Sequence, residues 1–219
     1  MTTSPSIART PRVTQRDEIR LLLADGSVRR ASALRAAGIR PQAIADALTA
    51  GLIARTAVGT YYVPGASSEP DLVDLAAAVA GMPRAIVCLT SAAGLCGLDG
   101  SASLKLWLAL PVGAHPAKSG KMPRQLLRWS HSGAFEVGIA TKEICGVAVR
   151  YTDAARTVVD LLRYRRHFSD AGGIEVGVRA VRRFIADGGQ PSTLLQMAEV
   201  LRASKKTRQA ISTLSAAFG

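Results

Sequence analysis

Apolar positions recur with a helical period near the start of the chain, in three short segments that follow one another closely. Ile19, Leu22 and Leu23 are three and four residues apart, which places them on one face of a first helix. Thr14 precedes that helix in the position of an N-cap, and Asp25–Gly26 ends it. The spacing therefore predicts an amphipathic helix between Thr14 and Asp25.

Two further helices are predicted directly after the first. One covers residues 31–37, with Leu34 as its buried side chain, and Gly38 ends it. The other begins at Pro41, because a proline in the first turn of a helix loses no hydrogen bond, and it ends at Gly51. Its predicted apolar face consists of Ile44, Ala45, Ala47 and Leu48.

Two short apolar runs, at residues 52–55 and 60–63, complete this part of the chain. Residues 57–59 connect them and Pro64–Gly65 follows the second run, which together predict a β-hairpin. Three short helices, a glycine corner and an immediate hairpin follow the order of a winged helix-turn-helix. We therefore expect residues 14–65 to form a winged helix-turn-helix DNA-binding domain.

This order predicts which residues contact double-stranded DNA. The first residues of a recognition helix meet base edges, where Gln pairs with adenine and Arg with guanine, while other cations hold phosphates. We expect Asp46 to accept from cytosine or to face Arg35 or Arg40. The predicted DNA-binding residues are Arg40, Gln42, Ala43 and Asp46 on the third helix, Arg29 and Arg30 before the second, and Arg55, Thr56, Thr60 and Tyr61 in the hairpin.

The alternative is that these arginines are ordinary solvated charges on a small packing module. The overall charge favours DNA binding. The chain of 219 residues carries 28 Lys and Arg against 16 Asp and Glu, a net charge of +12. Such an excess indicates a polyanionic partner, although a basic charge can also serve only to keep a protein in solution.

The N-terminal block resembles the winged-helix domain of AbiEi-type antitoxins, which belong to type IV abortive-infection toxin–antitoxin systems. The shared features are a Gly-Ile corner at 38–39, a short helix, Gly-Leu-Ile at 51–53, and a hairpin that ends in Gly-Thr-Tyr-Tyr-Val-Pro-Gly at 59–65.

Composition divides the chain into three parts. Residues 1–13 are rich in Thr, Ser, Pro and Arg and predict a disordered basic arm. The polar segment 66–70 predicts a hinge, and residues 71–219 are numerous enough for a core of their own. We predict an α+β protein, in which the winged helix-turn-helix is followed by a mixed α/β domain that ends in a helix bundle.

Hydrophobic patterns predict the elements of the C-terminal domain. Arg156 and Asp160 lie four residues apart on one predicted helix, where they can pair. Short strands at this spacing predict a mostly antiparallel sheet. Helices are expected over 71–80, from 90 to 97, over 153–164 with Thr152 as the cap, over 175–187 and 191–203, and from 205 onward; strands are expected at 104–110, 126–130, 135–139 and 147–151; and 112–122 is expected to be a loop.

Basic side chains also cluster in this second domain. They predict secondary contacts to DNA or to an acidic protein partner, and a solvated face is the alternative. They are Lys118, Lys121, Arg179, Arg182, Arg183, Lys205 and Lys206.

The second domain resembles the C-terminal domain of AbiEi antitoxins as well. The resemblance lies in the segments at 90–98, 106–111 and 149–162 and in the closing helices. It implies a repressor that binds inverted repeats in its own promoter. It also implies an antitoxin that counteracts a nucleotidyltransferase-type toxin without forming a stable complex with it.

Nothing in the sequence predicts catalysis, a metal site or a cofactor. The three histidines lack the spacing of zinc ligands, and Glu136 and Glu143 lack the following lysine of a nuclease motif. Cys88, Cys96 and Cys145 lie in apolar settings and indicate reduced core residues of a cytoplasmic protein. No apolar run is long enough to span a membrane. The alternatives to an antitoxin are a nuclease or other nucleic-acid enzyme with a DNA-targeting domain, and a plain transcription regulator without a toxin partner.

Overall fold

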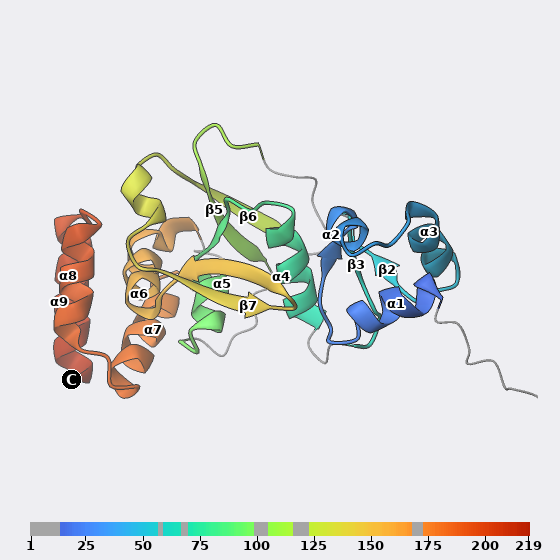
Figure 1. The fold of residues 1–219 in the computed structure, drawn as a ribbon. Coiled ribbons are helices and arrows are strands. Elements are labelled where there is room, and N and C mark those ends of the chain that lie inside the picture. The colour runs from blue at the N-terminus through green and yellow to red at the C-terminus, as the bar shows by residue number, and fades with distance from the viewer. Residues whose placement is uncertain (1–13, 57–58, 67–69, 99–104, 116–122, 168–172) are drawn as a thin grey trace, which may run out of the picture.

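The computed structural model of the protein describes residues 14–56, 59–66, 70–98, 105–115, 123–167 and 173–219. These residues form an α+β fold with one three-stranded and one five-stranded sheet. Figure 1 shows an elongated molecule with the smaller sheet and the first three helices at one end. The larger sheet lies in the middle, and the last two helices lie at the other end.

The three predicted N-terminal helices are present as α1 (Gln15–Leu22), α2 (Ala31–Ala36) and α3 (Pro41–Thr49). Thr14 caps α1 through a reciprocal pair of hydrogen bonds. Its hydroxyl oxygen accepts from the Asp17 backbone N–H, and the Asp17 carboxylate accepts from the Thr14 backbone N–H. The hydrogen bond from Thr14 lowers the pKa of Asp17, because it stabilises the ionised carboxylate.

The small sheet contains one strand that the sequence pattern did not predict. The hairpin strands are β2 (Ala54–Arg55) and β3 (Thr60–Tyr62), which are shorter than expected. The added strand is β1 (Arg29–Arg30), which pairs antiparallel with β3 and gives the order β1-β3-β2. Two adjacent arginines carry no alternating pattern, so only the pairing of their backbone with β3 identifies them as a strand.

The inward face of α3 differs from the predicted face by one position. Ala43, Ile44 and Ala47 are buried, whereas Ala45 is exposed. The predicted face contained Ala45 in place of Ala43, since both alanines lie beside Ile44 in the sequence. The core of this part of the chain consists of Ile19, Leu23, Leu34, Ile39, Ala43, Ile44, Ala47, Ile53 and Tyr61.

The large sheet is mixed rather than mostly antiparallel. Its strand order is β6-β5-β4-β8-β7. The pairs β6–β5 and β4–β8 are parallel, and the pairs β5–β4 and β8–β7 are antiparallel. Short strand patterns do not encode pairing direction, which depends on the connections between strands. The strands are β4 (Ile86–Val87), β5 (Leu106–Pro111), β6 (Arg124–Trp129), β7 (Ile139–Ile144) and β8 (Val147–Thr152).

The predicted strand at 135–139 is wrong. The 3-10 helix η1 (Ser132–Phe135) and a turn occupy most of that segment, and only Ile139 belongs to a strand, β7. The turn includes Gly138, whose backbone φ is +61° and whose carbonyl accepts from the Asp153 N–H. An extended strand cannot include such a backbone angle.

Helices cover the large sheet and extend beyond it (Figure 1). They match the predicted segments, with one correction at the cap of α6. Asp153, not Thr152, caps that helix, because its carboxylate accepts from the Arg156 N–H at 2.8 Å. The helices are α4 (Pro70–Ala80), α5 (Leu89–Leu95), α6 (Ala154–Arg163), α7 (Ile174–Ala186), α8 (Pro191–Val200) and α9 (Lys205–Phe218).

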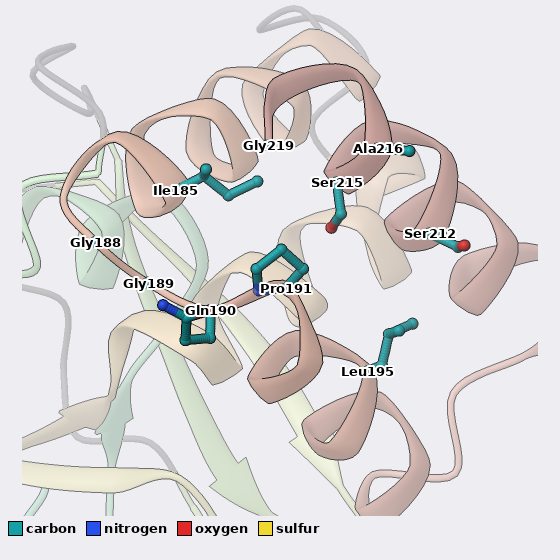
Figure 2. Close-up of a pocket in the computed structure, with 10 residues that line it drawn as sticks. All are labelled: Ile185, Gly188, Gly189, Gln190, Pro191, Leu195, Ser212, Ser215, Ala216 and Gly219. Atoms are coloured by element: carbon teal, nitrogen blue, oxygen red, sulfur yellow. The ribbon is translucent and has the colours of Figure 1, made fainter.

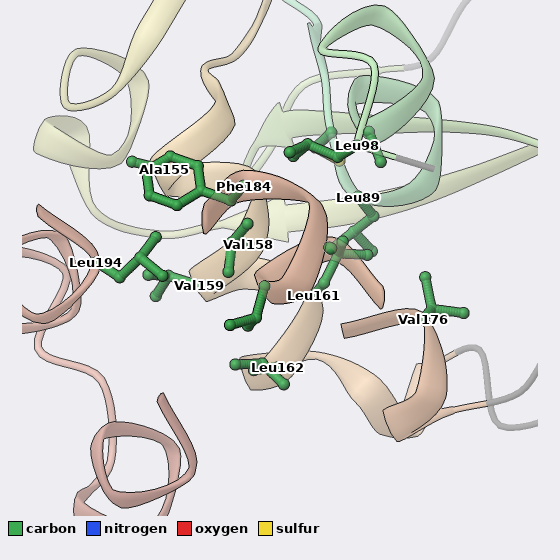
Figure 3. Packing of buried hydrophobic residues seen from close by; sticks show 14 of the residues in the cluster. Leu89, Leu98, Ala155, Val158, Val159, Leu161, Leu162, Val176, Phe184 and Leu194 are labelled. Carbon is green, nitrogen blue, oxygen red and sulfur yellow. The ribbon is translucent and has the colours of Figure 1, made fainter. Parts of the chain in front are cut away.

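Helix α6 is the centre of the largest hydrophobic cluster. Figure 3 shows Val158 and Leu162 of α6 packed among side chains of α7 and α8, which include Phe184 and Leu194. Gly177 of α7 allows the two helices to approach closely, since a Cβ atom there would lie 2.5 Å from a methyl carbon of Leu162.

A buried ion pair lies on α6, and its arginine also contacts residues outside that helix. Nε of Arg156 lies 3.1 Å from the Asp160 carboxylate, and both side chains are almost wholly buried. The same guanidinium donates to the carbonyls of Ala134 and Val137 and lies 4.3 Å from the centre of the Trp129 ring. One arginine thus joins α6, β6 and the segment around η1.

The N-terminal part contacts the large sheet at the turn between β7 and β8. The Val28 N–H donates to the Cys145 carbonyl at 2.7 Å, and the Val28 side chain lies in the hydrophobic cluster of α4 and the sheet. Cys145 and Gly146 both have positive φ, as a two-residue hairpin turn of type I′ requires. A Cβ atom on Gly146 would lie 2.9 Å from Cβ of Ser27, so this contact depends on the missing side chain.

We predict that Gly146→Ala lowers the free energy of unfolding more than Gly97→Ala does. Both glycines have a φ of +70°, but nothing lies within 4 Å of a Cβ atom at Gly97. The backbone cost is therefore matched at about 1–2 kcal/mol, and overpacking against Ser27 adds about 1–3 kcal/mol for Gly146→Ala alone. Urea unfolding measures the difference, and equal losses would contradict the close contact with Ser27.

We also predict that Arg156→Ala lowers the free energy of unfolding by about 3–5 kcal/mol, because the Asp160 carboxylate then remains buried without a counter-charge. Arg183→Ala is the matched control, since it breaks an exposed pair with Asp187 that has the same four-residue spacing. That pair should contribute less than about 1 kcal/mol. Similar losses in the two variants would show that Arg156 does not hold this part of the fold.

Candidate nucleic-acid interface

The outward face of α3 presents polar side chains one helical turn apart. Nε2 of Gln42 donates to the Asp46 carboxylate at 2.9 Å, on the side of the helix opposite the buried Ile44 and Ala47. Gln42 is exposed and Asp46 is partly exposed. The hydrophobic core therefore fixes the orientation of α3 and leaves both side chains accessible to a ligand.

Arg40 stands at the N-terminus of α3, where a side chain of α1 holds it. The Oε1 atom of Gln15 accepts from both Nε and the backbone N–H of Arg40, at 3.0 Å and 3.3 Å. The Gln15 side-chain amide donates in turn to the Gly38 carbonyl at 3.0 Å. Gln15 thus ties α1 to the corner before α3 and positions Arg40. The sequence alone does not predict this role of Gln15, because a glutamine in the first turn of a helix carries no distinctive pattern.

Asp46 has partners other than the predicted ones. Its second carboxylate oxygen lies 3.5 Å from Nη2 of Arg16 on α1, instead of facing Arg35 or Arg40. Nor does the sequence alone predict this contact of Arg16, since residues on two helices cannot be paired from sequence spacing. Arg16 partly offsets the charge of Asp46, the only acidic side chain of α3, and Gln42 adds a neutral hydrogen bond.

Three predicted contact residues do not offer their side chains to solvent. Ala43 and Tyr61 belong to the hydrophobic core, and Thr60 is fully buried. The Thr60 hydroxyl is 2.6 Å from that of Thr56, which closes the hairpin. We correct the predicted set by removing Ala43, Thr60 and Tyr61, because period and propensity alone did not show which face of each element is buried.

The strands β1 and β2 of the small sheet carry exposed basic side chains. Arg29 and Arg30 of β1 and Arg55 of β2 are exposed. The Arg55 guanidinium lies 5.9 Å from the centre of the Tyr61 ring, so the buried tyrosine supports an exposed cation. Residues 14–65 contain seven arginines and four acidic residues, a net charge of +3, and all seven arginines are exposed.

The basic residues of the C-terminal part lie far from α3. Arg179, Arg182 and Arg183 are exposed on α7, and Lys205 and Lys206 are exposed in the first turn of α9. Figure 1 places α7 and α9 toward the opposite end of the molecule from α3. The predicted residues Lys118 and Lys121 lie outside the described residues. The structure therefore does not bring the secondary set together with the α3 surface.

Other chemistry is sparse in the described part of the chain. No group of three or more His, Cys, Asp or Glu side chains is placed there to hold a metal ion. None of the three cysteines, Cys88, Cys96 and Cys145, forms a disulfide bond within the described residues, and burial raises the pKa of Cys96 to about 11. A thiol with such a pKa is a poor nucleophile near neutral pH. Among the described helices, none combines the length and apolar character needed to cross a membrane.

A largely apolar cavity of about 580 Å³ lies between the α7–α8 turn and α9. Figure 2 shows Ile185, Pro191 and Ser215 around it. The hydroxyl of Ser215 is buried and has no hydrogen-bond partner within the described residues. None of the described residues that line this cavity is charged, so its lining does not indicate a nucleic-acid contact.

Comparisons with known proteins establish the fold and nothing finer. No protein-family model and no curated protein matches the chain. Among solved structures, the chain is similar to the crystal structure of the RV2827C protein from Mycobacterium tuberculosis, with a TM-score of 0.60. The match covers 95% of this chain and 78% of that one at 17% sequence identity. The two proteins therefore share a fold, and the likeness says nothing about activity.

Proposed function

We propose that this protein is a sequence-specific DNA-binding repressor and that residues 14–65 form its winged helix-turn-helix. The order of elements supports this proposal, because three helices are followed by the hairpin of β2 and β3. β1 completes a small antiparallel sheet with that hairpin. Helix α3 would be the recognition helix, since the major groove of B-DNA admits an α-helix whose first residues face the bases.

One observation carries the proposal. Arg40 and Gln42 are exposed together at the N-terminus of a helix whose opposite face is fixed in a hydrophobic core. Arginine and glutamine have the donor and acceptor geometry to read guanine and adenine, respectively. Gln42 donates a hydrogen bond to Asp46, and DNA binding would exchange that hydrogen bond for one to a base. Asp46 would keep its ion pair with Arg16.

Exposed arginines on the strands that precede and follow α3 in the chain can bind the phosphate backbone. Arg29 and Arg30 on β1 and Arg55 on β2 are the proposed phosphate contacts, which set register without reading sequence. Thr56, next to Arg55, is the remaining polar candidate in the hairpin. The partner is double-stranded DNA that carries the inverted repeats of the protein's own promoter, and the place of action is the cytoplasm.

The antitoxin part of the proposal rests on the resemblance to the AbiEi family. In that role the protein represses its own operon and counteracts a nucleotidyltransferase-type toxin without a stable complex. The proposal includes no catalytic step, metal or cofactor.

A gel-shift titration with the promoter duplex and a scrambled duplex of equal length tests DNA reading. We predict that Gln42→Ala weakens promoter binding by about 1–3 kcal/mol without changing its salt dependence, because it removes a base contact. Arg30→Ala should weaken binding to both duplexes and reduce the salt slope by about 1, because it removes a phosphate contact.

The control is Arg183→Ala, which removes one charge at a distance from α3 and should leave promoter selectivity unchanged. Equal affinity of the unmodified protein for both duplexes, with a steep loss in salt, would contradict the repressor. The charge of +12 would then act alone.

Co-expression with a nucleotidyltransferase-type toxin from the same operon tests the antitoxin role separately. We predict that the protein restores growth, while size-exclusion chromatography of the mixed proteins shows no stable complex. Absence of rescue by a protein that still selects its promoter would leave a plain transcription regulator. Rescue accompanied by a stable complex would contradict the proposed mode of neutralisation.

A further inference from the structure

A second cavity, of about 380 Å³, lies at the end of the molecule away from α3. Its walls come from the end of β6, the segment around η1, the end of α6 and the turn between α8 and α9. Arginines and aromatic rings dominate its lining, and none of the described residues that line it is acidic. The residues that carry the argument are Arg128, Trp129, Arg156, Arg163 and Arg202.

Three of these arginines form no salt bridge with a described residue. Arg156 is paired with Asp160, but no described carboxylate lies within 4.0 Å of the other three side-chain cations. Arg128 donates to the carbonyls of Pro111 and Ala114, at 3.2 Å and 2.6 Å, which fixes its position without cancelling its charge. The three unpaired arginines are exposed, and their positive charges at the edge of the cavity favour an anion inside it.

Arg202 occupies a backbone position that ordinarily belongs to glycine. It follows the last turn of α8 with a φ of +52°, and the bonds from Arg202 N–H to the Glu199 carbonyl and from Ala203 N–H to the Ala198 carbonyl form a Schellman motif. Helices α3 and α7 end in the same motif with Gly51 and Gly188 at this position. Arginine is the strained choice here, which points to a use for its side chain.

Trp129 also lines this cavity. Its indole N–H is buried and finds no hydrogen-bond acceptor among the described residues, although the ring contacts Arg156 and Phe135.

We propose that this cavity binds a small phosphate-bearing anion, of a size up to a mononucleotide. Guanidinium groups bind phosphate oxygens through paired hydrogen bonds, and three unpaired charges suit a group with more than one negative charge. The cavity volume lies within the range of small-molecule sites. This site is independent of the proposed DNA-binding surface, because its walls come from β6, α6 and the end of α8, which lie away from α3 (Figure 1).

Isothermal titration calorimetry of the full chain tests the proposal, with pyrophosphate, AMP and uncharged adenosine as separate probes. We expect binding of pyrophosphate or AMP, and none of adenosine. Tighter binding of AMP would identify a nucleotide as the source of the phosphate, and tighter or equal binding of pyrophosphate would identify a free phosphate compound.

Arg202→Gly is the decisive variant. It should weaken anion binding at least about tenfold, as expected for a charged hydrogen bond, and at the same time raise the melting temperature, because glycine relieves the left-handed backbone. Arg182→Ala on α7 removes one exposed charge outside the cavity and should change neither property. If the role of Arg202 were only structural, Arg202→Gly would not weaken anion binding while it raises the melting temperature.

Three results would overturn the proposal. One is that neither pyrophosphate nor AMP binds the unmodified protein. Another is that Arg202→Gly and Arg182→Ala weaken binding equally, which would reflect overall charge. The third is that a DNA duplex displaces pyrophosphate and is itself weakened by Arg202→Gly, which would make the cavity part of a nucleic-acid surface instead of a small-molecule site.

Discussion

The buried guanidinium of Arg156 is the constraint on which the C-terminal part of the structure depends. A charge taken out of water must be paired, and this one is paired with Asp160 and bonded to two carbonyls of the segment around η1. Burial raises the pKa of Asp160, and the adjacent guanidinium opposes that rise. The pair fixes α6 against β6, and α6 then organises the packing of α7 and α8. The same arginine forms one side of the basic cavity.

The N-terminal part has its own hydrophobic cluster and meets the rest of the chain at α4 and the β7–β8 turn, through Val28 and Tyr62. This arrangement leaves α3 at one end of the molecule with a polar face outward (Figure 1). For a DNA-binding protein the separation would be useful, because a helix can enter a groove only if the remainder of the fold stays clear of the duplex. Gln15 and Arg16, on α1, determine how Arg40 and Asp46 are presented.

Local patterns predicted much of the fold. The cap at Thr14, the proline that begins α3 and the period of Ile19 and Leu23 each act within a few residues, so the sequence contains them directly. What could not be predicted depends on distant partners. β1 exists only through its pairing with β3, and the parallel pairing of β4 with β8 depends on the intervening chain. The same limit applies to the candidate site. Arg29, Arg30, Arg40 and Arg55 are exposed, as a DNA contact requires, whereas the burial of Thr60 and Tyr61 depends on packing that a local pattern does not contain.

The most direct test of the central claim, that the outward face of α3 reads DNA, is an NMR titration of the ¹⁵N-labelled full chain with its promoter duplex. We predict that the amide chemical shifts change most in α3 and less in β1 and β2, while the amide chemical shifts of α7 and α9 do not change. Shifts confined to α7 and α9, or spread evenly over every exposed basic segment, would contradict it and leave α3 without a role in recognition.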